Sequence, residues 1–325
     1  NDPAFASNKS LPLHRWVPWI AGFSRDFVQS ALERHMKQPG LVLDPFAGVG
    51  TTLVEANLAG HDVAGFEINP YAAFACRIKT QAYRIEPSAL EKATLEFLSF
   101  HEDASRNDRK PKAQPPEGFR TRTAFYSPKV LRKVLLTLDF IEQLNDKSAS
   151  DAFRLAFAST MVTYSNYSYE PSLSRKVSAG RPEVEDHAVD QAIAGKLYEM
   201  ASDIDWVRAR MKGCKPSSIV VNESFFDSFR QIKSGSVDLL ITSPPYLNNY
   251  HYNRNTRPHL YWLGLASSPK DFKELEYRNF GKFWQTVREN ERIDLDFPIA
   301  DEEIRRTLGV LRRKNPENGV YGGRG

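Results

Sequence analysis

Residues 41–67 read LVLDPFAGVGTTLVEANLAGHDVAGFE, and this stretch decides the fold class. The short apolar run at its start predicts a buried strand that ends at an Asp-Pro pair and a glycine loop. Residues 51–59 predict a helix that Gly60 closes, and a second apolar run predicts the next strand, with Glu67 at its end. Strand, loop, helix and strand form a βαβ unit, so we expect an α/β fold with a parallel sheet.

The flanking sequence continues this pattern. Apolar and aromatic residues at helical spacing over residues 14–37 predict a helix before the first strand, and Asn69-Pro70 opens another helix after the second. Residues 218–224 predict a third strand, and residues 237–241 predict a fourth.

The middle and the end of the chain have a different character. Residues 86–215 are mostly helical in period, and residues 104–118 form a polar, proline-rich connector. The predicted organisation is therefore an N-terminal part of the α/β domain (residues 1–85), a helical insertion that can serve target recognition (86–215), and a second part of the same domain (216–325). The last sixty residues are charged and helical in period without a convincing fifth strand, so we expect this part to be incomplete.

Composition excludes several classes of protein. The net charge of +4 permits an anionic partner, and the hydrophobic fraction of 41% is compatible with a substantial core. Two cysteines argue against a disulfide scaffold or a zinc site, and we expect no bound metal. No stretch predicts a signal peptide or a membrane span, so we expect a cytoplasmic protein with no membrane partner.

The glycine loop and the acid after the second strand together predict a nucleoside site. Gly48 and Gly50 let the backbone approach a ligand, although an ordinary βα turn has the same pattern. An acid at the position of Glu67 commonly accepts ribose hydroxyls, and the alternative is a solvated carboxylate. Thr51 and Thr52 stand where a dinucleotide fingerprint would need other residues, so a nucleoside without a pyrophosphate fits better.

Residues 242–246, Thr-Ser-Pro-Pro-Tyr, end the fourth strand with a rigid corner. The two prolines fix φ and lack N–H groups, so the corner presents carbonyl oxygens without local donors. These oxygens and the Ser243 hydroxyl can accept hydrogens from an NH₂ group, and Tyr246 can stack on a flat heterocycle. A strand-terminating turn explains the prolines but not their coincidence with the glycine loop and the acid.

These motifs resemble the S-adenosyl-L-methionine site and the catalytic motif of DNA amino-methyltransferases of the N4-cytosine and N6-adenine family. The resemblance implies a Rossmann-like class I methyltransferase fold with a mostly helical insertion. It implies catalytic roles for Ser243, Pro244, Pro245 and Tyr246. The residues implied to bind S-adenosyl-L-methionine are Phe23, Ser24, Asp44, Pro45, Phe46, Gly48, Gly50, Thr51, Thr52, Glu67, Ile68, Asn222 and Glu223.

The resemblance also implies a reaction. The target base is flipped out of double-stranded DNA, and its exocyclic amine lies between Ser243, the Pro244 carbonyl and Tyr246 and attacks the sulfonium methyl directly. Ser-Pro-Pro-Tyr is more typical of the N4-cytosine enzymes, so we expect N4-cytosine methylation in restriction-modification or a related defence, with a restriction endonuclease as a possible partner and the nucleoid as the site of action. N6-adenine methylation, RNA amino-methylation and a non-catalytic nucleic-acid-binding fragment are the alternatives. The oligomeric state has no signal in the sequence.

Two further segments are candidates for nucleic-acid contact. Residues 164–181 mix aromatics, hydroxyls and three cations, which suits phosphates and unstacked bases or, equally, a surface loop with an aromatic anchor. Residues 248–258 follow the corner directly, so we expect them to line the substrate cleft. Cytosine carbon-5 methylation requires a Pro-Cys nucleophile, and neither Cys76 nor Cys214 follows a proline, so we expect both cysteines to be packing residues.

Overall fold

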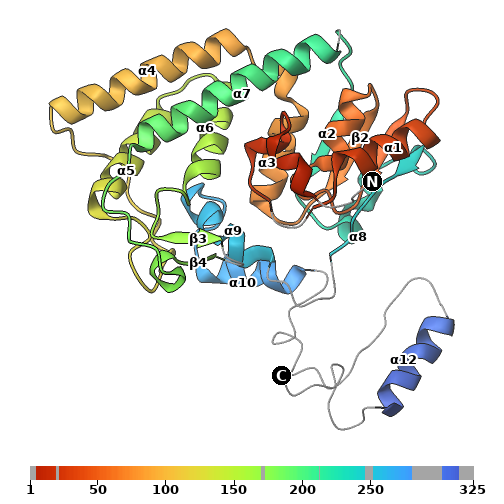
Figure 1. Ribbon diagram of the computed structural model, residues 1–325. Helices are drawn as coiled ribbons and strands as arrows, with labels where there is room; N and C mark the ends of the chain where they lie inside the picture. Colours follow the sequence, from red (N-terminus) through yellow and green to blue (C-terminus); the bar gives the residue numbers. More distant parts are fainter. Residues whose placement is uncertain are drawn as a thin grey trace. The chain divides into compact units, whose positions relative to one another are not determined.

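The computed structural model describes residues 5–19, 22–169, 173–211, 213–245, 252–279 and 302–314. The chain divides into two compact units (Figure 1). The first comprises residues 1–244 and 252–278, and it contains the sheet and nearly all the described helices. In the second, residues 245–251 and 279–325, the described part is chiefly the amphipathic helix α12 (Glu302–Lys314).

A four-stranded parallel sheet organises the first unit. Its strands are β1 (Leu41–Asp44), β2 (Asp62–Phe66), β5 (Ser218–Val221) and β6 (Leu239–Leu240), in the order β5-β2-β1-β6. Leu43 pairs with Ala64 on one side and with Leu240 on the other. The predicted α/β class is therefore confirmed, with strands at all four predicted positions.

The two faces of this sheet are covered unequally. Val42 and Val63 pack on one face against helices α1 (Arg25–His35) and α2 (Thr51–Leu58). The opposite face carries Leu43, Ala64 and Phe66, and the Phe66 ring meets Phe225 of the short helix α8 (Phe225–Ser228), with centroids 5.3 Å apart.

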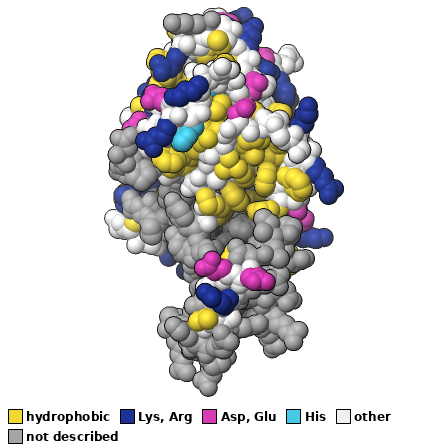
Figure 2. All heavy atoms as spheres, turned by 90° about the vertical axis from the view of Figure 1, so that its right-hand side faces the viewer, with side chains coloured by type: hydrophobic (Ala, Val, Ile, Leu, Met, Phe, Trp, Pro, Cys, Tyr) yellow, Lys and Arg dark blue, Asp and Glu magenta, His cyan; other side chains and the backbone are white. Residues whose placement is uncertain are grey.

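The register places Ile219 of β5 and Leu240 of β6 on this second face, because Ile219 pairs with Ala64 and Leu240 with Leu43. Ile219 keeps 46% and Leu240 52% of its surface exposed. Figure 2, which views the right-hand side of Figure 1, shows hydrophobic side chains gathered on that side of the molecule. In α/β proteins both faces of a parallel sheet are normally covered by helices.

Local sequence explains where the helices begin and end. The Asn69 side chain caps α3 (Pro70–Thr80), which has proline at its first position. Gly60, with φ +89°, turns the chain away two residues after the end of α2. The predicted helix over residues 14–37 is only partly correct. Residues 14–16 form a 3-10 turn, η2 (His14–Trp16), and α1 starts at Arg25, because the Ser24 hydroxyl accepts the Phe27 N–H and fixes the helix start there.

Between β2 and β5 the chain forms a largely helical layer. Rings of Phe97, Phe140 and Phe153 pack in its core, with neighbouring centroids 5.3 to 5.5 Å apart. A two-stranded antiparallel hairpin, which was not predicted, interrupts the helices. The elements of this layer are η3 (Ala82–Arg84), α4 (Pro87–Arg106), α5 (Pro128–Glu142), α6 (Lys147–Thr160), β3 (Tyr167–Tyr169), β4 (Leu173–Arg175), η4 (Lys176–Ala179) and α7 (Val189–Met211). The remaining described elements of this unit lie before β1 or after β5 in the sequence, and they are η1 (Phe5–Ser10), η5 (Phe229–Gln231), α9 (Tyr252–Trp262) and α10 (Pro269–Arg278).

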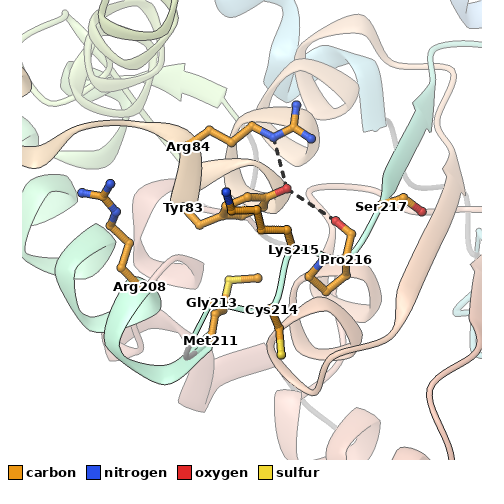
Figure 3. Close-up of a pocket in the computed structure, with 9 residues that line it drawn as sticks. All are labelled: Tyr83, Arg84, Arg208, Met211, Gly213, Cys214, Lys215, Pro216 and Ser217. Atoms are coloured by element: carbon orange, nitrogen blue, oxygen red, sulfur yellow. Dashed lines mark hydrogen bonds between the residues drawn. The ribbon is translucent and has the colours of Figure 1, made fainter.

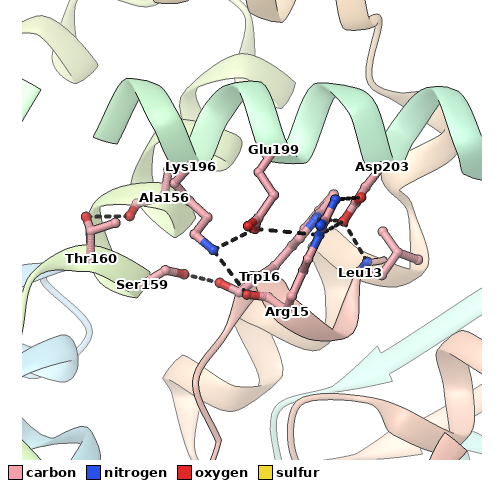
Figure 4. A network of polar contacts seen from close by, with 9 residues as sticks. All are labelled: Leu13, Arg15, Trp16, Ala156, Ser159, Thr160, Lys196, Glu199 and Asp203. Atoms are coloured by element: carbon pink, nitrogen blue, oxygen red, sulfur yellow. Dashed lines mark hydrogen bonds and ion pairs between the residues drawn. The ribbon is translucent and has the colours of Figure 1, made fainter. Parts of the chain in front are cut away.

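A buried carboxylate on α7 fastens the N-terminal segment to this layer (Figure 4). Asp203 is 1% exposed and accepts hydrogen bonds from the Leu13 N–H at 3.0 Å, from the Arg15 guanidinium at 2.5 and 3.1 Å, and from the Trp16 indole at 2.8 Å. Lys196 of the same helix donates to the Arg15 carbonyl at 3.1 Å. The segment that precedes α1 is thus tied to a helix nearly two hundred residues away.

Neither a membrane-spanning helix nor a metal-binding cluster occurs among the described residues. None of the helices there has the length and the apolar character that crossing a membrane requires. No group of three or more His, Cys, Asp or Glu side chains in the same residues is arranged to hold a metal ion.

Candidate functional site

The glycine loop, Glu67 and the described start of the proline corner meet at the carboxyl ends of β1, β2 and β6. Strand β2 lies next to β1 on one side, and β6, which comes much later in the chain, lies next to β1 on the other side. In open parallel sheets, a crevice for ligands forms at such a reversal of strand order. The glycine loop after β1 and Thr242 after β6 flank this reversal, and Glu67 follows β2.

Glu67 holds the glycine loop through backbone hydrogen bonds. One carboxylate oxygen accepts the Gly48 N–H at 2.8 Å, and the other accepts the Asn69 N–H at 2.7 Å. The residue as a whole is half-buried, but burial of its carboxylate, with a smaller effect from the negative charge of Asp44, raises the pKa of Glu67 to about 7. Each oxygen has further acceptor capacity, so the carboxylate can also accept ligand hydroxyls.

Asp44 joins the glycine loop to the proline corner. Its Oδ1 accepts the Thr242 hydroxyl at 2.6 Å and the Phe46 N–H at 3.0 Å. Asp44 is 1% exposed, and this burial raises the pKa of its carboxyl group to about 6 despite those hydrogen bonds. Its Oδ2 is buried without a hydrogen-bond partner among the described residues. A buried unpaired acceptor indicates a place where a donor from a ligand can bind.

The two glycines of the loop have different neighbours. At Gly48 (φ +52°) the one described atom within 4 Å of an added Cβ is the Trp19 indole nitrogen, at 3.7 Å, so the described part of the loop is open there. At Gly50 (φ +86°) an added Cβ would lie 2.6 Å from the Cys76 sulfur of α3. Close approach of a ligand is therefore possible at Gly48, whereas Gly50 is required by its backbone conformation and by packing against α3.

The other residues of the loop lie deeper. Thr51 and Thr52 are 5% and 0% exposed, and the Thr52 hydroxyl donates to the Ile241 carbonyl at 3.3 Å, which ties α2 to β6. Pro45 is buried, and the Phe46 ring is half-buried. In the described geometry both threonines are buried, and the Thr52 hydroxyl contacts a protein group.

A buried lysine that was not predicted from the sequence contacts the backbone of the glycine loop. Lys79 of α3 is 1% exposed, and its ammonium donates to the Val49 carbonyl at 2.7 Å. Burial lowers the pKa of Lys79 to about 8. The one available signal was its spacing, because Lys79 lies on the same face of α3 as the buried Ala72 and Cys76.

Residues after β5 approach the end of β2. The Asn222 side chain donates to the Glu67 carbonyl at 2.8 Å and to the Ile68 carbonyl at 3.2 Å. Ile68 is half-buried, and the Glu223 carboxylate, just before α8, accepts the hydroxyl of Ser228 at the end of that helix. Asn222 therefore joins the predicted site, while the Glu223 carboxylate has a local partner.

Two aromatic rings lie beside this group. The centroids of Phe46 and Phe226 are 6.2 Å apart, and Phe226 keeps 54% of its surface exposed. Phe23 is half-buried and packs edge-to-face on Phe27, with centroids 5.8 Å apart, and Ser24 is buried as the cap of α1. The exposed Phe226 ring can stack on a flat heterocycle.

The proline corner is described as far as Pro245. Ser243 is half-buried, and Pro244 is exposed. Pro245 belongs to the second unit, so its placement relative to the first three corner residues is not described. Tyr246 lies outside the described residues.

Residues 248–251 of the predicted cleft lining lie outside the described residues, and the prediction is wrong for three polar side chains of α9 that turn inward. Asn253, Asn255 and Thr256 are 2%, 8% and 3% exposed because they hydrogen-bond to neighbouring elements of the fold. In the segment 164–181, Tyr164 and Tyr167 are 0% and 8% exposed, as expected of the aromatic anchor rather than of a base-stacking surface.

A pocket with a cavity volume of about 640 Å³ lies at the opposite end of β5 (Figure 3). Its residues precede β5 or come from α7 and η3, whereas the predicted motifs lie beyond the carboxyl ends of the strands, so we place the candidate site at the motifs. Among its lining residues is Cys214, which is exposed. The expectation that both cysteines are packing residues is therefore correct for the buried Cys76 and wrong for Cys214.

Comparison with known proteins agrees with these motifs. A family model described as DNA methylase matches residues 12–75. The chain is 23% identical to the type II methyltransferase M.BsoBI of Geobacillus stearothermophilus over 99% of this chain and 69% of that protein. It is 25% identical to the type II methyltransferase M.MvaI of Kocuria varians over 68% of this chain, and 32% identical to M.MjaII of Methanocaldococcus jannaschii over 29%. The chain spans about half the length of M.MvaI.

Proposed function

We propose that this chain, which is related to the N4-cytosine and N6-adenine amino-methyltransferases, methylates the exocyclic N4 of cytosine in DNA, with S-adenosyl-L-methionine as the methyl donor. One observation carries the proposal: the Thr242 hydroxyl is 2.6 Å from Asp44, so the proline corner begins beside the glycine loop. A donor site and an acceptor site for a methyl group must be neighbours, because direct transfer needs the reacting atoms about 3 Å apart.

The residues at the loop suit the proposed cofactor. The unpaired Asp44 Oδ2 is an acceptor for a donor group, and the open space at Gly48 admits a ligand close to the backbone. Glu67 would accept ribose hydroxyls, and Phe46 and Phe226 would pack on the adenine beside Ile68 and Asn222. S-adenosyl-L-methionine supplies a methyl group that is already activated by its sulfonium.

The corner would orient the amine of the target base. The Ser243 hydroxyl and the Pro244 carbonyl accept its two hydrogens, which leaves the nitrogen lone pair directed at the methyl group. A ring at Tyr246 would stack on the flipped base. As the new nitrogen–carbon bond forms, the carbon–sulfur bond breaks and the amine releases one proton.

We also propose the fold class and the division of the chain. The order β5-β2-β1-β6, with all strands parallel and the motifs at their carboxyl ends, supports a Rossmann-like class I methyltransferase. Residues 1–85 and 216–325 would form that domain, with residues 86–215 as an insertion that serves target recognition. DNA is the proposed partner, and the type II relatives support a role in restriction-modification with a cognate endonuclease.

Incubation of the purified protein with methyl-labelled S-adenosyl-L-methionine and mixed double-stranded DNA and RNA tests the proposal. The nucleosides are then separated and identified by mass. We expect labelled N4-methylcytosine from DNA. Labelled N6-methyladenine would overturn the base assignment, and label in RNA alone would overturn the substrate.

Cofactor binding is measured separately by calorimetry. Glu67→Ala and Gly48→Asp should abolish binding, while Glu96→Ala, at a 59%-exposed carboxylate on α4, is the matched control. Tyr246→Ala should lower methyl transfer and leave cofactor affinity unchanged. Absence of binding by the unaltered protein would contradict the proposal.

A further inference from the structure

The Asn69 side chain connects two parts of the candidate site. Its oxygen caps α3 by accepting the N–H groups of Tyr71 at 3.1 Å and Ala72 at 3.2 Å. Its amide nitrogen donates to Asn253 at 3.1 Å and to the Thr256 hydroxyl at 2.8 Å, both on α9. All three polar side chains are 5% exposed or less.

The same residue also contacts the predicted cofactor acid, because its backbone N–H donates to Glu67 at 2.7 Å. An asparagine suits this position because the cap requires an acceptor and the bridge requires a donor. The neighbouring residues add a second contact between the same helices, since the Tyr71 ring stacks on His259 of α9 with centroids 4.2 Å apart.

Helix α9 begins at Tyr252, shortly after the proline corner. The chain is therefore attached to the candidate cofactor site on both sides of the corner. On one side Thr242 donates to Asp44 at 2.6 Å, and on the other Asn253 and Thr256 accept from Asn69. Hydrogen bonds between buried groups are costly to break, so Thr242 before the corner and the start of α9 after it are both held to the candidate cofactor site.

We infer that the bridge from Asn69 to Asn253 and Thr256 is a positioning device that sets the catalytic corner relative to the bound cofactor, an inference that rests on the proposed function. Its effect belongs to the methyl-transfer step, because a displacement of about 1 Å can lower a rate by about a hundredfold without changing affinity. On the proposed function, cofactor affinity depends on Glu67 and the glycine loop. Removing the bridge leaves both of these in place.

The test removes the two acceptors on α9 and keeps the cap of α3. Asn253→Leu with Thr256→Val preserves side-chain shape, and Thr256→Ser alone keeps the hydroxyl. Thr94→Val is the matched control, because Thr94 is fully buried and its hydroxyl also donates within its own helix. Denaturation curves establish the temperature at which every variant is folded.

In the double variant we expect kcat to fall at least tenfold while the Kd for S-adenosyl-L-methionine changes less than twofold. Thr256→Ser and Thr94→Val should retain the unaltered kcat. An unchanged kcat in the folded double variant, or a parallel loss of cofactor affinity, would overturn the inference.

Hydrogen exchange separates this result from a failure of the proposed function. Adding S-adenosyl-L-methionine should slow amide exchange in residues 252–262 of the unaltered protein and not in the double variant. Unaltered protein that shows this coupling but methylates no nucleic acid contradicts the proposed function alone. Equal protection of both proteins contradicts the bridge, and a protein that binds no cofactor contradicts both.

Discussion

Replacing Gly50 by alanine should destabilise the protein through two separable effects. An L-residue at φ +86° pays for the left-handed conformation, which costs about 1–2 kcal/mol. The new Cβ would also lie 2.6 Å from the Cys76 sulfur, and overpacking of a core typically costs about 1–3 kcal/mol. We therefore expect Gly50→Ala to lower the free energy of unfolding by about 2–5 kcal/mol.

Two companion variants separate these effects. Gly60 has nearly the same φ, +89°, and an added Cβ would meet no atom of the described residues within 4 Å, so Gly60→Ala should cost only the conformational part. Cys76→Ala removes the clashing sulfur, after which the nearest Cys76 atom is its Cβ at 3.4 Å. In a double-mutant cycle, Cys76→Ala should recover about 1–3 kcal/mol on the Gly50→Ala background.

Urea denaturation followed by circular dichroism measures the unfolding free energy of the unaltered protein, the three single variants and the double variant, and the m-values show whether all five unfold alike. If Gly50→Ala cost no more than Gly60→Ala, the packing argument would fail. A coupling energy below about 0.5 kcal/mol between positions 50 and 76 would have the same meaning, because independent sites add to within that margin. Gly50 would then owe its place in the loop to a ligand rather than to α3.

The remaining predictions concern buried charges. Because the folded-state pKa of Glu67 is about 7, its carboxylate is protonated below that pH, so affinity for S-adenosyl-L-methionine should be about tenfold lower at pH 6 than at pH 8; calorimetry that gave equal affinities would contradict the acceptor role. The pKa of Lys79 falls from 10.5 to about 8 on folding, so the unfolded chain binds the extra proton between these values and stability rises with pH in that window. The difference in unfolding free energy between the unaltered protein and Lys79→Met should therefore change by about 3 kcal/mol from pH 8 to pH 10.5, and a constant difference would refute this. Asp203→Asn should cost about 2–4 kcal/mol in thermal denaturation, because one acceptor and the charge beside Arg15 are lost, whereas Asp205→Asn, at an exposed neighbour, should cost little.

The sheet and the position of the site were predictable because their signals are local. A run of apolar residues ending at Asp44, a glycine loop and a second run ending at Glu67 specify strand, turn, helix and strand without information from elsewhere in the chain. Asn69 before Pro70 is also a local signal, because a helix cap depends on its immediate neighbours in the sequence.

The incorrect or missing predictions involve partners that are distant in sequence. The polar residues of α9 suggested a surface that contacts a ligand, but Asn253 and Thr256 are buried because Asn69, more than 180 residues away, supplies their donor. Lys79 was missed for a similar reason, since a lysine in a helix is ordinarily solvated and only the fold brings the Val49 carbonyl to it. The hairpin β3–β4 has strands of three residues, too short for a periodic signal.

The outer side of β6 has a practical consequence for anyone who purifies this chain. Among the described residues β6 pairs only with β1, and its Leu240 is 52% exposed. An apolar edge strand is a template for intermolecular β-pairing, so the protein should aggregate increasingly as its concentration rises. Leu240→Lys places a charge at that edge without altering the motifs, and this variant is the natural starting point for crystallisation and spectroscopy.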